Sequence, residues 1–182
     1  ENPALGNYGG ETFTFGQVAT QIEKLHIFFK NAGIEKQEKI ALCAKNTARW
    51  GMSFLAANTY EAVVVPILAD FHPDSIKSLV NHSESTILFT DNDIWPKLDI
   101  KEMPAIKAVI STTDLTLHYG RTKEIEETIQ FIEKQHQYLD ETKTQLETYL
   151  NYVKNGKFDL SEEGTVDQKI TKITTVLDKY DE

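Results

Sequence analysis

The sequence predicts an α/β fold in which a layer of parallel strands is followed by an α-helical hairpin. Strand-like and helix-like segments alternate between Lys39 and Thr90, which is the rhythm of βαβ units. The run Val63–Val65 is continuous and β-branched, as in strands covered on both faces. After Thr122, apolar residues recur every seven positions, which predicts the hairpin. The pattern changes near residues 112–122, so we expect two parts, residues 1–115 and residues 116–182.

The chain opens with a short strand and an amphipathic helix. Residues Thr12 to Phe15 alternate between polar and aromatic side chains, as a strand does. Four apolar residues then follow at spacings of four, three and four, which places them on one face of a helix that Gly33 ends. These residues are Val18, Ile22, Leu25 and Phe29. We expect this face to pack on the sheet.

A buried strand and a buried helix are predicted next. Residues Lys39 to Ala44 form the strand, and Asn46 and Thr47 offer side-chain oxygens to the free amides at the start of the helix. The small and aromatic residues of the helix favour close packing. The valine strand follows, and we expect it to be internal to the sheet. It should end at Pro66, because proline cannot donate a hydrogen bond to a ladder.

Three more elements complete the predicted α/β part. A short helix follows Asp74, and further strands cover residues 87–89 and 108–110. The sequence Asp91-Asn92-Asp93 is similar to a calcium loop, but Pro96 stands where such a loop needs glycine. We therefore interpret it as a helix-capping turn.

The segment after Thr122 has the pattern of two helices. Apolar residues at intervals of seven predict a helix over residues 122–155, about 50 Å long at the usual rise per residue. They are Ile125, Ile132, Leu139, Leu146 and Val153. The same spacing resumes from Val166 to Tyr180, so a second helix can lie antiparallel to the first. The stripe either packs within the chain or contacts a second copy or another partner helix, and both alternatives stay open.

Several segments resemble the N-terminal region of AMP-forming acyl-CoA synthetases, the adenylate-forming family that activates carboxylic acids with ATP. The matching segments are Thr14-Phe15-Gly16-Gln17-Val18, Ile40 to Asn46, Val63 to Pro66, and His82-Ser83 through Phe89. Within the family, the sequence of residues Ala44 to Trp50 is most similar to that of long-chain fatty-acid CoA ligases. The resemblance implies that the α/β part is the N-terminal part of an adenylate-forming enzyme domain.

Two features depart from the family pattern. Glu61 stands where the family usually has glycine, so we expect Glu61 either to adopt the tight turn with some strain or to reshape it. The phosphate-binding loop of the family, a Ser/Thr/Gly-rich run ending in Pro-Lys-Gly, does not occur in the sequence. The complete family enzyme is expected to use ATP, Mg and CoA. For this chain we predict no catalytic, cofactor-binding or metal-binding residue.

Composition excludes several functional classes. The 182 residues carry a net charge of −9, which opposes binding to a nucleic-acid backbone. The single cysteine, Cys43, cannot form an internal disulfide and is predicted to be a core residue. The five histidines fall in separate elements, and no apolar run is long enough to span a membrane. We expect a soluble, cytoplasmic chain that is an excised piece or a processed product.

Two functional hypotheses follow. The resemblance implies an N-terminal fragment of an AMP-forming acyl-CoA ligase, which when complete would activate a carboxylic acid with ATP and transfer it to CoA. The isolated chain would then be inactive, because the ATP-binding and catalytic motifs are absent from its sequence. The alternative is a non-catalytic interaction module, in which the helical hairpin binds a partner or a second copy.

Overall fold

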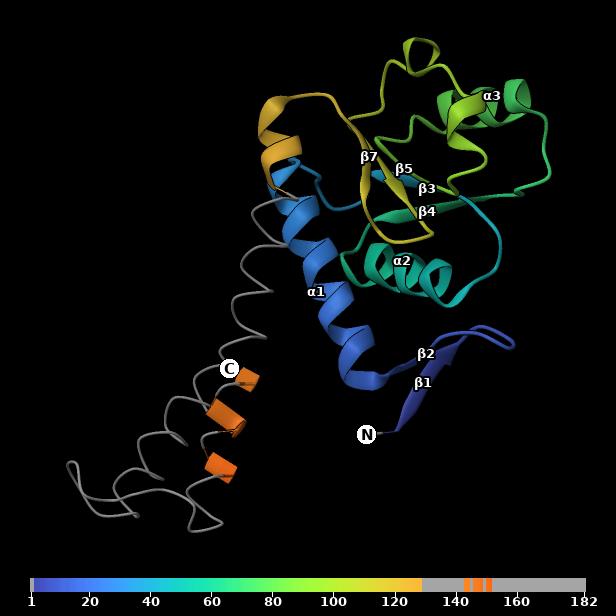
Figure 1. Ribbon diagram of the computed structural model, residues 1–182. Coiled ribbons are helices and arrows are strands. Elements are labelled where there is room, and N and C mark those ends of the chain that lie inside the picture. Colours follow the sequence, from blue (N-terminus) through green and yellow to red (C-terminus); the bar gives the residue numbers. More distant parts are fainter. Residues whose placement is uncertain (1, 129–142, 145, 149, 152–182) are drawn as a thin grey trace. The chain divides into compact units, whose positions relative to one another are not determined.

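The computed structural model describes residues 2–128, 143–144, 146–148 and 150–151 (Figure 1). The chain divides into two compact units, residues 1–132 and residues 133–182. The described part of the first unit contains all the strands reported below. Among the described residues, no helix is long and apolar enough to cross a membrane.

The first unit begins with a β-hairpin and a long helix. Strands β1 (Pro3–Gly6) and β2 (Thr12–Thr14) pair antiparallel, and helix α1 (Phe15–Asn31) follows directly. The Thr14 side chain accepts a hydrogen bond from the backbone N–H of Gln17, and the Gln17 side chain accepts one from the N–H of Thr14. Gly33, with φ of +64°, follows the end of α1. Strand β2 and helix α1 agree with the sequence prediction, whereas β1 was not predicted.

A five-stranded sheet forms the centre of the unit. Its strands are β3 (Lys39–Cys43), β4 (Val63–Ile67), β5 (Ile87–Thr90), β6 (Ala108–Ser111) and β7 (Leu117–Gly120). They lie in the order β4-β3-β5-β6-β7. The pairs among β3, β4, β5 and β6 are parallel, and β7 is antiparallel to β6. The predicted parallel-stranded α/β layer is therefore confirmed.

Helices cover both faces of this sheet (Figure 1). Side chains of α1 and α2 (Ala48–Thr59) pack with Ile40, Leu42 and Phe89 on one face. Side chains of α3 (Pro73–Ser83) pack on the other face with the alternate residues of the same strands. Two short 3₁₀ helices, η1 (Trp95–Lys97) and η2 (Ile100–Glu102), lie between β5 and β6 in the chain. The prediction of a buried α2 holds for one side only, because Leu55 is exposed.

Strand β4 corrects the prediction for the valine run. It lies at an edge of the sheet and pairs only with β3 among the described strands, and Val63 is 42% exposed. Pro66 does not end β4, which continues to Ile67. The backbone N–H of Val63 donates to the Glu38 carbonyl at 2.9 Å. Because residues alternate along a strand, the nitrogen of Pro66 faces away from β3, where a missing N–H costs no ladder bond.

Glu61 adopts the predicted left-handed turn. Its φ is +64°, in the region that glycine enters without strain. Its carbonyl accepts a hydrogen bond from the backbone N–H of Gln37 at 2.8 Å, and its carboxylate pairs with Lys36 at 2.6 Å. Of the two alternatives expected at Glu61, the structure shows the strained turn.

The sheet extends past residue 115, because β7 pairs with β6. Residues 123–128 are helical, and Ile125 is buried with side chains of α1 and the sheet. A Cβ atom added to Gly120 would lie 2.9 Å from Glu126 Cγ and 3.2 Å from Ile125 Cγ2, so glycine allows this close approach. At Ile125, the side chain therefore packs within the chain, which is one of the two alternatives left open for the stripe.

The rest of the predicted hairpin is described only in part. The described residues 143–144, 146–148 and 150–151 are helical, and Leu146 is half-buried. Ile132, Leu139 and Val153 lie outside the described residues, as does the whole predicted second helix.

Candidate functional site

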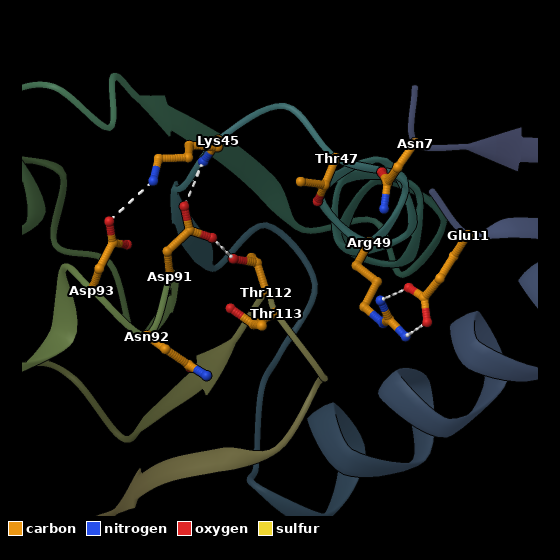
Figure 2. A pocket seen from close by; sticks show the side chains of 10 residues that line it. All are labelled: Asn7, Glu11, Lys45, Thr47, Arg49, Asp91, Asn92, Asp93, Thr112 and Thr113. Atoms are coloured by element: carbon orange, nitrogen blue, oxygen red, sulfur yellow. Dashed lines mark hydrogen bonds and ion pairs between the residues drawn. The ribbon is translucent and has the colours of Figure 1, made fainter. Parts of the chain in front are cut away.

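The strand order of the sheet marks one place where a ligand site is expected. From β3 the chain passes through α2 to β4 on one side, and then through α3 to β5 on the other side of β3. In open parallel sheets, ligands bind outside the carboxyl ends of the strands at such a switch point. A pocket of about 460 Å³ lies there (Figure 2). Its lining residues are Asn7, Glu11, Lys45, Thr47, Arg49, Asp91, Asn92, Asp93, Thr112 and Thr113.

Asp91 connects the ends of three strands in this pocket. It follows β5 and is only 7% exposed. Its Oδ2 accepts a hydrogen bond from the backbone N–H of Lys45, just after β3, at 2.8 Å. Its Oδ1 accepts a second bond from the hydroxyl of Thr112, just after β6. Both oxygens of a nearly buried carboxylate are thus satisfied, which makes Asp91 a structural link.

The side chain of Lys45 is occupied by a second carboxylate. Its Nζ lies 3.0 Å from Asp93 Oδ2 (Figure 2). The hydrogen bond from Lys45 holds the pKa of the Asp93 carboxyl below its usual value, and the same bond raises the pKa of Lys45. Both side chains are more than half exposed, so this ion pair contributes little to stability.

The β1–β2 hairpin closes the opposite wall of the pocket. The Asn7 side chain accepts a hydrogen bond from the backbone N–H of Ala48, in the first turn of α2, at 2.8 Å. Both oxygens of Glu11 accept bonds from the Arg49 guanidinium, which lies 5.0 Å from the centre of the Phe13 ring. The bond from Arg49 also lowers the pKa of the Glu11 carboxyl.

The charges that line the pocket do not fit a nucleotide triphosphate. Two cations, Lys45 and Arg49, face three carboxylates, and each cation already pairs with one of them. An amide at the start of α2, where a helix would offer its N–H groups to a phosphate, donates to Asn7 instead. In the described part of the chain, no cluster of three or more histidine, cysteine or acidic residues could hold a metal ion. We therefore assign no step of ATP chemistry to this pocket.

A second pocket adjoins the first at Lys45. It has a volume of about 440 Å³ and lies at the carboxyl end of β4. Its lining residues are Ala44, Lys45, Asn46, Trp50, Pro66, Ile67, Leu68, Ala69 and Asp70. Two pockets therefore lie at the carboxyl ends of the strands, and Lys45 lines both of them.

The structure revises one sequence interpretation at this site and confirms another. Residues 92–94 form a turn directly before η1, and the Asp91 carbonyl accepts hydrogen bonds from the N–H groups of Ile94 and Trp95, each at 3.1 Å. No side chain caps η1, because the Asp91 carboxylate bonds to neighbouring strand ends instead. Cys43 is fully buried, as predicted, and its Sγ lies 3.7 Å from the Leu68 carbonyl oxygen. Burial raises the pKa of the Cys43 thiol to about 11. The sequence feature that could have identified Asp91 as a site residue is its position as an acidic residue directly after a predicted strand.

Comparisons with known proteins agree on one family. The family model described as AMP-binding enzyme matches residues 1–161. The long-chain-fatty-acid–CoA ligase heimdall of Drosophila melanogaster is 28% identical over 113 residues, which are 60% of this chain and 17% of that protein. The chain thus spans about a sixth of the length of this relative.

Solved structures show the same fold. Coronafacic acid ligase from Pectobacterium brasiliense superposes with a TM-score of 0.58 and 18% identity, covering 70% of this chain and 26% of that one. The anthranilate CoA ligase AuaEII, solved with anthranoyl-AMP, superposes with a TM-score of 0.55 and 17% identity, covering 66% of this chain and 22% of that one.

Proposed function

The chain belongs to the family of AMP-binding enzymes, and from that premise we propose that it is the N-terminal part of an AMP-forming acyl-CoA ligase of the long-chain fatty-acid type. The observation that carries the proposal is the family match over residues 1–161, together with the ligase heimdall as a sequence relative. The complete enzyme would activate a fatty acid with ATP and Mg, and transfer the acyl group to CoA. The family and the single cysteine support a cytoplasmic location.

Within such an enzyme, this segment would act as scaffold. Adenylate chemistry depends on backbone amides and cations that neutralise phosphate charge. The sequence lacks the family's phosphate-binding loop, and Lys45 and Arg49 are each paired with a carboxylate. We therefore propose that the 182-residue chain by itself neither hydrolyses ATP nor forms an acyl-adenylate.

Pyrophosphate exchange tests both parts of this proposal. The purified 182-residue chain, incubated with ATP, Mg and palmitate, should give no exchange above a blank without fatty acid. The full-length protein that contains this segment should catalyse exchange of pyrophosphate with ATP when a fatty acid is added. Exchange by the 182-residue chain would contradict its inactivity. A longer product with a complete phosphate-binding loop that uses no carboxylic acid would contradict the ligase assignment.

The second candidate is a non-catalytic interaction module. The paired state of Lys45 and Arg49 favours it, because both cations that line the first pocket are then engaged by carboxylates rather than free for a phosphate. The two candidates are compatible, since a segment that descends from a ligase can serve only as a binding surface. A pull-down that recovers one stoichiometric partner with the inactive chain would support the module.

A further inference from the structure

Strand β7 redirects one histidine out of the regular alternation of its side chains. On β6, Val109 pairs with Tyr119 and Ile110 pairs with Leu117, so His118 is the extra residue of a β-bulge. Bulges re-aim side chains in this way. The His118 ring stacks on the indole of Trp95 in η1, with 5.9 Å between the ring centroids and 12° between the planes. An edge strand is thereby tied to the segment that follows β5.

This segment lines the first pocket, which Figure 2 shows. The loop between β5 and η1 places residues 91–93 in that pocket. Two hydrogen bonds join the start of the loop to the end of β6, because the Thr112 hydroxyl donates to the Asp91 carboxylate and the Ser111 hydroxyl donates to Asn92 Oδ1 at 2.8 Å. The stacked pair of rings joins the far end of the loop to β7.

The charge state of His118 decides whether the stack is favourable. Its Nε2 is buried and has no hydrogen-bond partner in the described part of the chain. A neutral imidazole can leave that nitrogen without a proton, whereas an imidazolium must place an N–H there. A buried donor without an acceptor is costly, and more so when it carries a charge. The stacked position therefore suits the neutral ring.

The groups around the ring do not reverse this preference. Burial is the strongest influence on the imidazole and holds the pKa of His118 below its ordinary value, although the Asp114 carboxylate acts to raise it. A cation over an indole face is also attracted, but 5.9 Å is close to the outer limit of about 6 Å for such contacts. Of the other titratable groups on the packed elements, η1 carries Lys97, whose charge acts on Asp93, and β7 carries Tyr119. Strand β6 carries none.

We propose that the stack of His118 on Trp95 is a pH-sensitive latch between β7 and the loop that lines the first pocket. The neutral ring keeps the latch closed. When His118 takes up a proton, its ring leaves the indole for solvent and the Asp114 carboxylate, and the Trp95 side chain becomes exposed at that end of the loop. The buried side chain of Ile94 keeps η1 on the sheet, so the opening is local. The proposal does not depend on the ligase assignment.

Tryptophan fluorescence tests the latch. The chain has two tryptophans, so a Trp50→Phe variant reports on Trp95 alone. Between about pH 7.5 and about pH 5, its emission should move to longer wavelength, with a midpoint below the ordinary pKa of histidine, while the far-UV circular dichroism stays constant. Adding His118→Phe should abolish this shift, because phenylalanine can stack but cannot take up a proton. His82→Phe is the matched control, since His82 is exposed on α3, and it should leave the shift unchanged.

Proton NMR of the wild-type chain gives a second measurement that needs no substitution at Trp50. The His118 imidazole, assigned by the loss of its signal in His118→Phe, should titrate below the ordinary pKa of histidine, and the indole N–H of Trp95 should shift with the same midpoint. An emission shift that survives His118→Phe would overturn the proposal, as would the absence of any shift. Quenching without a change in wavelength would also overturn it, because the imidazolium would then remain on the indole. A fall in circular dichroism with the same midpoint would replace a local latch by unfolding of the whole unit, and would overturn it too.

Discussion

Replacing Asp91 should separate a hydrogen-bonding link from a simple surface charge. Asp91→Ala leaves the Lys45 N–H and the Thr112 hydroxyl without their acceptor at a nearly buried position. Each bond to a charged group contributes about 1.5 kcal/mol or more, so the loss should reach about 3 kcal/mol. Asp91→Asn can keep both contacts, because its oxygen accepts from Lys45 and its amide donates to Thr112 once that hydroxyl rotates. We expect a loss of about 1 kcal/mol.

Urea unfolding followed by circular dichroism measures both losses. The free energy of unfolding should fall in the order wild type, Asp91→Asn, Asp91→Ala, and the melting temperature of Asp91→Ala should drop by about 10 °C. Asp93→Asn is the control, because Asp93 is 58% exposed and pairs only with Lys45 in the pocket. It should leave the midpoint nearly unchanged. Equal losses for Asp91→Asn and Asp91→Ala would refute the argument that satisfied bonds, rather than the charge, make Asp91 a link.

Three further predictions concern single sites. Glu61→Gly should raise the free energy of unfolding by about 1 kcal/mol by removing left-handed strain, whereas Glu61→Ala should bring no gain; urea midpoints compare the two. Cys43 should react with a disulfide reagent at pH 8 at least about 100-fold more slowly in the native chain than in urea, because it is buried with a raised pKa; equal rates would show that it is accessible. Lys107→Met should cost about 1–2 kcal/mol in thermal unfolding, since Lys107 Nζ lies 3.2 Å from Glu38 Oε1 and donates to the Gly33 carbonyl at 2.8 Å; an unchanged melting temperature would contradict this.

Local signals in the sequence predicted the elements well, because local interactions decide them. Thr47 was expected to cap α2, and its side chain accepts the N–H of Trp50 at 3.1 Å. Glu61 was expected either to take a glycine-like conformation or to reshape its turn, and its φ is positive. In both cases the residues that decide the geometry are neighbours in the chain.

Strand order and the site were less predictable, because they depend on contacts between distant segments. A β-branched run such as Val63–Val65 occurs in central and edge strands alike, and the crossovers decide which it becomes. The register of β7 with β6 shifts between Val109 and Ile110, which obscures the alternation that predicts a strand. Asp91 acquires its role only because β5 lies beside β3 and β6.

The close approach of Ile125 to Gly120 has a practical consequence for dividing the chain. A shortened protein that ends at residue 115 would lose β7, uncover β6, and remove Ile125 from the apolar side chains of α1 and the sheet. Any comparison of the 182-residue chain with a version lacking its C-terminal residues should therefore keep everything through residue 128. Otherwise, aggregation through the newly opened sheet edge would be mistaken for the loss of a natural partner.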